Sequence, residues 1–278
     1  MSYPRILTIQ DISCVGQCSL TVALPIISAC GAETCVLPTA VLSTHTGGFS
    51  GYTVHDLTDD MPAVNEHWIR EGIKFDAIYT GYLGSTRQTE YVGKILRTVR
   101  KDGAPVIIDP AMADNGRLYK GFDKEFVESM KAFCKSADYV LPNITEAAML
   151  TGIEYRTEYN REYVDLLLSG MLSLGCKNVI LTGVSYKADR TGVVVSEAGG
   201  CSYYEHEKAE KSCHGTGDIF ASAFVGALVM GSGAYAAAGI AADYTLECIK
   251  ATVREPAHWY GVRFEPVLPY LVKRLRAL

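Results

Sequence analysis

Short apolar segments alternate with longer segments of helical periodicity along most of this chain. The apolar segments lie at residues 5–10, 75–79, 104–110, 138–142 and 178–182, and each is short enough to be a buried strand. Strands that are apolar throughout and separated by helices form a mostly parallel sheet that is covered on both faces. The sequence therefore predicts an α/β protein with three layers, α/β/α, around a mostly parallel central sheet.

The segments between these strands predict the covering helices. They lie at residues 20–29, 63–70, 89–100, 123–134 and 158–174, and the last shows the clearest periodicity. On that helix, five residues share one face and are expected to be buried: Tyr163, Leu166, Leu167, Met171 and Leu174.

The remaining chain predicts a hairpin followed by a helical end. Two β-rich runs at residues 192–196 and 201–206 form the expected hairpin. No linker, low-complexity tract or internal repeat interrupts the alternation. We therefore expect one domain over residues 1–278.

Polar or glycine residues follow four of the predicted strands. They include Asp11, Tyr82, Asp109 and Thr182. In open parallel sheets, ligands bind beyond the carboxyl ends of the strands. We therefore expect these four residues to lie near a binding site.

The charge balance argues against one class of function. The chain has 26 Lys and Arg against 31 Asp and Glu, which gives a net charge of −5. A dedicated nucleic-acid binder usually carries a basic surplus, so we expect no nucleic-acid partner. An anionic small molecule is not excluded, because helix N–H groups can bind it without Lys or Arg.

Cysteine usage and hydropathy indicate the cellular compartment in which the protein works. The nine cysteines include no Cys-x-x-Cys pair, and their scattered positions are typical of a reducing environment. No signal-peptide pattern is found at residues 1–6, and no run reaches the ~18 apolar residues of a transmembrane helix. We therefore expect a cytoplasmic protein with no membrane contact.

The strongest chemical motif is Gly215-Thr216-Gly217-Asp218, which precedes a helix of small and apolar residues. Glycines allow a phosphate to approach the backbone, and the N–H groups at a helix start attract anions. The alternative is that Asp218 is only the N-cap of a helix that follows a tight turn. The helix is apolar on all faces and hence buried, which favours a functional role for its acid.

This motif resembles the Gly-x-Gly-Asp signature of the ribokinase-like superfamily of small-molecule kinases. The resemblance is strongest to the pyridoxal kinases, which phosphorylate vitamin B6. Four further stretches agree in order: residues 43–47 (Ser-Thr-His-Thr-Gly), 81–85 (Gly-Tyr-Leu-Gly-Ser), 109–114 (Asp-Pro-Ala-Met-Ala-Asp) and 142–146 (Pro-Asn-Ile-Thr-Glu). Five ordered motifs cover essentially the whole chain, so a ribokinase-like fold is implied.

The resemblance implies catalytic roles for the glycine motif. Asp218 would be the base for the 5'-hydroxyl of pyridoxal, and the N–H groups of Gly215, Thr216 and Gly217 would form an anion hole for the transferred phosphoryl group. The six histidines show no metal-ligand spacing. Cys213 lies beside the motif, and we interpret it as a buried, inert thiol rather than a reactive one.

The resemblance also implies how ATP and metal would be held. Asn143 and Glu146 resemble the pair that holds magnesium through water; a capping box with Asn143 as N-cap is the alternative, and both roles can hold together.

Four further residues resemble positions near the nucleotide: Asp109, Asp114, Tyr119 and Thr182. The alternative for Asp109 is an acidic turn residue preset by Pro110, and the alternative for Thr182 is an ordinary strand residue.

On the substrate side, Thr46 and Tyr82 match positions that contact pyridoxal, and a tyrosine between glycines suits stacking on a flat ring. Asp11 departs from the pattern, because many pyridoxal kinases have serine there. Residues 14–19 also lack the usual Gly-Asn pair. An acid in the pocket would accept hydrogen bonds from a ring hydroxyl, an amino group or a protonated ring nitrogen, which leaves hydroxymethylpyrimidine open as a substrate.

We therefore expect an ATP-dependent kinase that phosphorylates the hydroxymethyl group of pyridoxal, pyridoxine or pyridoxamine. The alternatives are a hydroxymethylpyrimidine kinase and a non-catalytic B6-binding protein. The resemblance implies ATP and Mg²⁺ as cofactors, with a monovalent cation such as K⁺ as a further candidate, and a homodimer. There is no P-loop motif and no dinucleotide fingerprint, which disfavours P-loop kinases and nicotinamide dehydrogenases.

Overall fold

The apolar runs form the centre of a single sheet in the computed structural model, which describes residues 3–209, 213–255 and 257–276. The strands of this sheet are β1 (Arg5–Ser13), β2 (Glu33–Leu42), β3 (Val54–Asp56), β4 (Ala77–Thr80), β5 (Val106–Ile108), β8 (Tyr139–Val140), β9 (Asn178–Lys187), β10 (Arg190–Glu197) and β11 (Gly200–Glu207). Within the described residues, they run in the order β11-β10-β9-β8-β5-β4-β1-β2-β3.

The centre of the sheet is parallel, as predicted. From β2 through β1, β4, β5 and β8 to β9, each strand pairs parallel to its neighbour. β3 adds antiparallel at one edge, and the expected hairpin of β10 and β11 adds antiparallel at the other. A separate short hairpin, β6 (Ala113–Asp114) with β7 (Arg117–Leu118), was not predicted.

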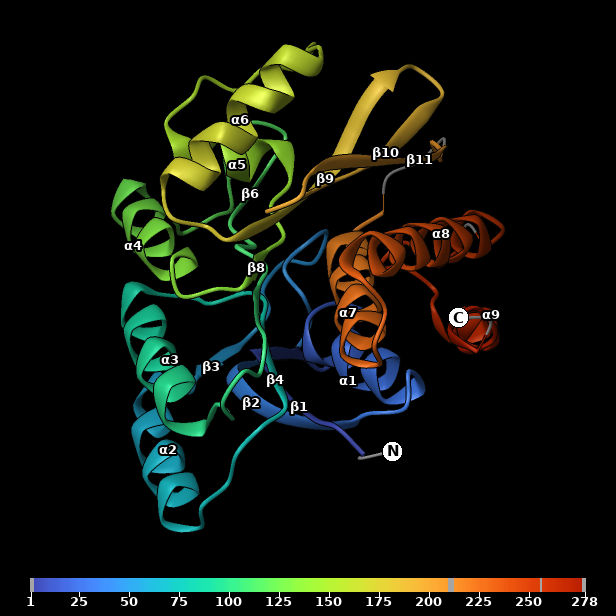
Figure 1. Ribbon diagram of the computed structural model, residues 1–278. Coiled ribbons are helices and arrows are strands. Elements are labelled where there is room, and N and C mark those ends of the chain that lie inside the picture. Colours follow the sequence, from blue (N-terminus) through green and yellow to red (C-terminus); the bar gives the residue numbers. More distant parts are fainter. Residues whose placement is uncertain (1–2, 210–212, 256, 277–278) are drawn as a thin grey trace.

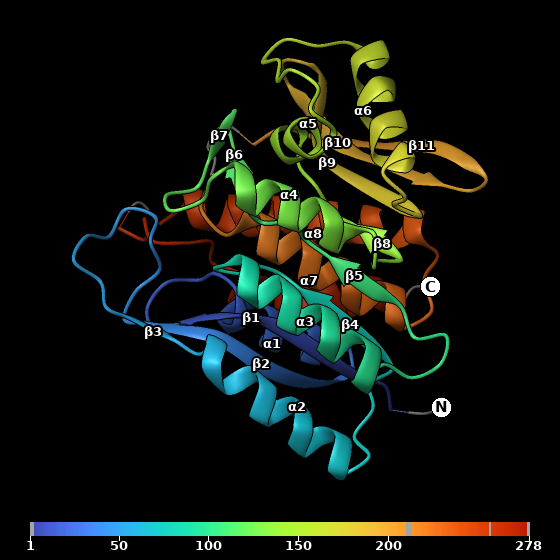
Figure 2. The same ribbon diagram turned by 90° about the vertical axis from the view of Figure 1, so that its left-hand side faces the viewer.

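Helices cover both faces of the sheet (Figures 1 and 2). They are α1 (Leu20–Ala29), α2 (Met61–Arg70), α3 (Thr86–Val99), α4 (Lys124–Cys134), α5 (Ile144–Thr151), α6 (Arg161–Ser173), α7 (Thr216–Val229), α8 (Ala234–Val253) and α9 (Leu268–Leu275). Figure 1 shows α1, α7, α8 and α9 on one side of the sheet and α2 to α6 on the other. The three-layer α/β/α prediction is confirmed.

Short polar side chains start several of these helices. Ser85 accepts a hydrogen bond from the Gln88 N–H at the start of α3, and Asp123 accepts one from Phe126 at the start of α4. Asn160 caps α6 in the same way. Each cap satisfies an N–H group that has no partner within the helix.

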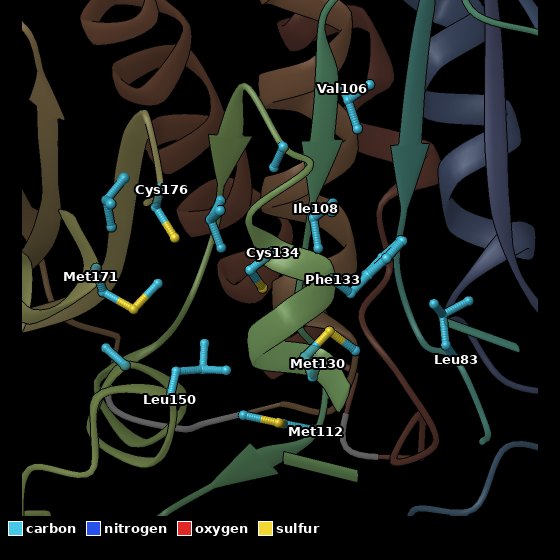
Figure 3. Packing of buried hydrophobic residues seen from close by; sticks show 14 of the residues in the cluster. Leu83, Val106, Ile108, Met112, Met130, Phe133, Cys134, Leu150, Met171 and Cys176 are labelled. Atoms are coloured by element: carbon cyan, nitrogen blue, oxygen red, sulfur yellow. The ribbon is translucent and has the colours of Figure 1, made fainter. Parts of the chain in front are cut away.

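Two apolar clusters, one on each face, hold the layers together. The cluster under α3 to α6 is rich in sulfur: Figure 3 shows Met130, Cys134, Met171 and Cys176 among packed aliphatic side chains. Flexible, polarizable side chains fill irregular gaps between helices and sheet. On the other face, α7 is buried along most of its length, which confirms that it is a central helix.

Three details differ from the sequence-based expectations. β1 continues past Asp11 to Ser13, with a register shift between Gln10 and Ile12. β9 continues past Thr182 to Lys187, with Gly183 at φ 71° inside the strand. On α6, Leu166 is 51% exposed, because the buried face turns toward Val164 and Leu168 instead.

In the part of the chain that the structure describes, none of the helices combines the length and the apolar character needed to cross a membrane.

Candidate active site

The predicted site residues gather at the carboxyl edge of the parallel strands. Asp11 lies near the end of β1, Tyr82 follows β4, Asp109 follows β5, and Thr182 lies where β9 passes the end of β8. Asp218 reaches this edge from the first turn of α7. The charges of Asp11 and Asp109 both act on Asp218, so these three carboxylates converge.

The glycine motif forms the start of α7. Gly215 is the N-cap, with φ 87° in the left-handed region, and no side chain caps the helix. Asp218 lies within the first turn, so the alternative that it is the N-cap is wrong. The N–H groups of a first helical turn have no partner within the helix, and here they follow a glycine. This is the geometry expected of an anion hole.

The Asp218 carboxyl is half-buried and electrostatically unusual. Its pKa is raised to about 7, first because burial disfavours the charged form and then because Asp109 and Asp11 are negative. A hydrogen bond from the backbone N–H of Ser19 acts in the opposite direction and lowers this pKa. A carboxyl with a pKa near neutrality suits proton transfer at physiological pH.

Asp11 and Tyr82 form the second part of the site. Asp11 is 5% exposed, and burial raises its pKa although Ser19 and Ser13 donate hydrogen bonds to it. Burial, the Asp11 charge and Tyr52 raise the pKa of Tyr82 to about 12, so its hydroxyl stays protonated. One face of the Tyr82 ring stacks on Phe122 at 5.4 Å.

The third predicted substrate residue is peripheral in this conformation. Thr46 lies in the loop between β2 and β3, and it is exposed. Its neighbour His45 is buried instead and contacts the chain near its C-terminal end.

Asp109 and Glu146 form a buried acidic pair. Burial is the first cause that raises the pKa of each, and the Glu146 charge adds to the effect on Asp109. Glu146 Oε1 accepts from the backbone N–H groups of Met112 at 3.0 Å and Ala113 at 3.4 Å. Two buried carboxyl groups that repel each other in this way favour a nearby cation.

Asn143 and Glu146 make the capping box that was one of the two predicted alternatives. The Asn143 side chain accepts from the Glu146 N–H at 2.9 Å, and Glu146 Oε2 accepts from the Asn143 N–H at 2.9 Å. The Asn143 Nδ2 group donates to the Ala113 carbonyl. Carboxylate lone pairs that these bonds do not use remain available to water.

Among residues 3–209, 213–255 and 257–276, no three or more His, Cys, Asp or Glu side chains are arranged to hold a metal ion directly. The carboxylates are hard oxygen ligands that repel one another, which fits a hydrated Mg²⁺ that also binds phosphate oxygens. They do not fit a metal cage made of protein ligands alone.

Of the remaining predicted nucleotide residues, Tyr119 and Asp114 lie near this pair. Burial raises the pKa of Tyr119, and the negative charges of Glu146, Asp109, Asp114 and Asp218 add to the shift. Tyr119, in the loop after β7, therefore lies near these four carboxylates. The exposed Asp114 accepts from the backbone N–H of Asn115 at 2.8 Å. Thr182 donates to the Pro142 carbonyl, which is the ordinary structural role.

Ser19 is the residue that sequence reasoning missed. It is buried between Asp11 and Asp218, donating through its hydroxyl to the first and through its N–H to the second. In the sequence it precedes a helix and therefore looks like a simple N-cap. Its backbone conformation, φ 54° and ψ −129°, carries no local sequence signal.

Comparison with known proteins identifies the family of this chain. A family model described as phosphomethylpyrimidine kinase matches residues 23–261. The chain therefore belongs to the phosphomethylpyrimidine kinase family, within the ribokinase-like superfamily. Membership of this kinase family supports phosphotransferase activity.

Curated relatives include kinases for two kinds of substrate. The pyridoxal kinase of Dictyostelium discoideum is 25% identical over 69% of this chain and 64% of that relative, so less than two thirds of its length is matched. The pyridoxine/pyridoxal/pyridoxamine kinase of Bordetella avium is 24% identical over 94% of each chain. The hydroxymethylpyrimidine/phosphomethylpyrimidine kinase of Bacillus subtilis is 26% identical over 77% of this chain and 78% of that relative.

Solved structures have the same fold. A protein of Bacteroides thetaiotaomicron, provisionally assigned as a phosphomethylpyrimidine kinase and crystallised with pyridoxal, is 35% identical with a TM-score of 0.91 over 97% of this chain and 96% of that chain. Pyridoxal kinase from Lactobacillus plantarum is 29% identical with a TM-score of 0.90 over 98% of each chain.

Proposed function

We propose that this protein transfers the γ-phosphoryl group of ATP to the 5'-hydroxymethyl group of pyridoxal, pyridoxine or pyridoxamine. The observation that carries the proposal is the convergence of Asp218 and Asp11 at one site, with Tyr82 beside Asp11. One acid has a pKa near 7 and lies at a helix start. The other lies beside a ring that suits a flat substrate.

In this proposal Asp218 is the catalytic base. Its carboxylate takes the proton of the substrate hydroxyl while the oxygen forms a bond to the γ-phosphorus. The bond between that phosphorus and the oxygen bridging to the β-phosphate breaks, and ADP leaves. The N–H groups of Gly215, Thr216 and Gly217 bind the phosphoryl oxygens, assisted by the positive end of the α7 dipole.

The nucleotide is proposed to lie over the acidic pair. Asp109, Asp114, Tyr119 and Thr182 surround its phosphates, while Glu146 and Asn143 hold water molecules. Mg²⁺, when bound there, neutralises charge on the nucleotide phosphates. A monovalent cation such as K⁺ is a further proposed cofactor.

On the substrate side, Asp11 is proposed to accept a hydrogen bond from the ring hydroxyl or ring nitrogen of the vitamer. Tyr82 offers the ring face that Phe122 leaves open, and Thr46 approaches from the loop after β2. The pyridoxal present in the related Bacteroides structure supports a substrate of this size and shape.

Phosphorylation of hydroxymethylpyrimidine is the second candidate. The family model and the Bacillus subtilis relative favour it, and Asp11 would serve an aminopyrimidine as well as a pyridine. A non-catalytic B6-binding protein is disfavoured by the kinase family and by an acid with a pKa near 7 at the phosphoryl site.

Steady-state kinetics test the choice of substrate. Coupled ADP release should be measured with each B6 vitamer and with hydroxymethylpyrimidine. We expect kcat/KM for one vitamer to exceed that for the pyrimidine. A hundredfold preference for the pyrimidine would select the second candidate, and binding of vitamers without ADP release would select the non-catalytic one.

We further propose that residues 1–278 work as one kinase domain, in the cytoplasm and as a homodimer. The unbroken sheet from β3 to β11 supports the single domain. The dimer rests on the resemblance to pyridoxal kinases, and light scattering of the purified protein tests it.

A further inference from the structure

Gln17 joins the loop before α1 to a distant segment of the chain. Its Nε2 donates to Glu265 Oε1 at 2.5 Å, and its Oε1 accepts from His258 Nε2 at 2.7 Å. A carboxylate only accepts, so the amide orientation is fixed by Glu265. The Gln17 backbone also forms an isolated parallel bridge with Gly261. We call His258, Tyr260, Gly261 and Glu265 the C-terminal clamp.

His45 provides a second anchor for this clamp. Its Nε2 lies 3.0 Å from the Tyr260 carbonyl, and its Nδ1 accepts from the Gly47 N–H at 2.8 Å. These partners require a neutral ring with the proton on Nε2. The His45 N–H also donates to the Val15 carbonyl at 2.9 Å. The clamp is thus attached to both loops that border the candidate substrate site.

The loop that Gln17 anchors reaches the catalytic acid directly. The Gln17 carbonyl oxygen lies against Gly215, where a Cβ would come within 2.3 Å of it. Two residues later, Ser19 is buried beside both acids, where its N–H lowers the pKa of Asp218 and its hydroxyl lowers that of Asp11. A displacement of the loop at Gln17 would therefore change the surroundings of both Asp218 and Asp11.

Ser19 holds a conformation that needs support. Its φ of 54° and ψ of −129° are strained for a residue with a side chain, and it makes no side-chain cap bond to α1. A strained backbone persists only where surrounding contacts hold it. The long-range contacts of Gln17 are contacts of this kind.

We propose that Gln17 is a positioning residue for phosphoryl transfer, which with His258 and Glu265 holds Ser19 in the conformation that binds Asp218 and Asp11. The inference rests on the proposed role of Asp218 as base. Gln17 itself touches neither substrate nor phosphate. It acts through Ser19 on the orientation and the proton affinity of the base.

Other titratable groups also face Asp218, and Gln17→Ala leaves their own side chains unaltered. They are Asp11, Cys18, Tyr79, Asp109 and Tyr119. A change in the Asp218 titration on replacing Gln17 therefore reports the Ser19 contact.

Gln17→Ala tests the inference against a matched control. Asn65→Ala removes a hydrogen bond of the same kind, from Thr98 Oγ1 at 2.6 Å, near the end of α3 remote from the site. Gln17→Ala should lower kcat about tenfold or more and leave the KM for ATP within about twofold. Glu265→Ala, at an exposed position, should show a smaller loss of the same kind. Asn65→Ala should lower the melting temperature without changing kcat.

The second readout is the titration of the Asp218 carboxyl by ¹³C NMR, with its signal identified by its absence in Asp218→Asn. This measurement needs no turnover. Loss of the Ser19 bond should raise the pKa of Asp218 by about half a unit to one unit. A wild-type protein that transfers no phosphate would contradict the proposed function, while the titration would still test Gln17. A wild-type kcat and an unshifted Asp218 pKa in Gln17→Ala would overturn the inference.

Discussion

The Cα of Gly215 lies so close to the Gln17 carbonyl that a Cβ at residue 215 would stand 2.3 Å from that oxygen. The same glycine has φ 87°, which disfavours any other residue. Gly215→Ala should therefore displace the start of α7 or the loop before α1, and should lower both stability and turnover. We expect a loss of about 1–3 kcal/mol of unfolding free energy, measured by denaturant titration.

Gly217→Ala is the control for this experiment. Nothing lies within 4 Å of a Cβ at this position, and its φ is not positive. The fold should therefore tolerate the substitution, with a denaturation midpoint close to that of the wild type. A loss of turnover in this stable variant would show that a ligand approaches the backbone there. Full turnover would contradict the anion-hole role of Gly217.

The pH dependence of kcat/KM should report the titration of Asp218. Burial and neighbouring negative charge raise its pKa to about 7, and a base works only when deprotonated. Activity should therefore fall about tenfold per pH unit below pH 7.

Asp11→Asn tests whether the loss of activity at low pH comes from Asp218 or from titration of the substrate. The variant removes a negative charge that raises the Asp218 pKa, so it should move the acidic limb to lower pH. A limb that stays in place would belong to the substrate or to another group.

The free energy of unfolding should depend on the Asp218 carboxyl in the opposite sense, falling with rising pH where activity increases. Because the folded-state pKa of Asp218 is raised, the folded protein holds an extra proton between about pH 4 and pH 7, and stability falls as pH rises through that window. Asp218→Asn lacks this loss. It should be more stable than the wild type at pH 8 by on the order of 1–2 kcal/mol, allowing for solvent screening. At pH 4 the two proteins should unfold at similar denaturant concentrations, and a variant that is less stable at pH 8 would refute the assignment.

Ser19→Ala separates the two contacts of Ser19. The variant loses the hydroxyl bond to Asp11 but keeps the N–H that binds Asp218. The pKa of Asp11 should rise further, and KM for the vitamer should increase about two- to tenfold. The acidic limb of kcat should not move. Ser13→Ala, which removes the other hydroxyl bond to Asp11, is expected to behave alike.

The sequence predicts the layers and the edge of the sheet well because those features are local. Apolar runs define the strands, and Asp109 or Tyr82 at the end of such a run must lie at the carboxyl edge of a parallel sheet. The capping box of Asn143 and Glu146 likewise follows from spacing alone.

Other features depend on contacts between segments far apart in the chain. Gln17 and Glu265 are 248 positions apart, and no local pattern indicates that they meet. In the sequence, Ser19 looks like an ordinary N-cap. Its strained backbone conformation has no local sequence signal and depends on tertiary contacts. Leu166 has helical spacing typical of a buried residue, but the neighbouring Val164 and Leu168 pack against the core instead.

The most direct test of the account compares wild type and Asp218→Asn with pyridoxal and ATP. Pyridoxal binding is measured by its absorbance change, and phosphoryl transfer by release of ADP. Asp218→Asn should bind pyridoxal within a few-fold of wild type, while its kcat should fall by roughly 10²–10⁴. An Asp218→Asn protein that forms ADP and pyridoxal 5'-phosphate at the wild-type rate would contradict the account.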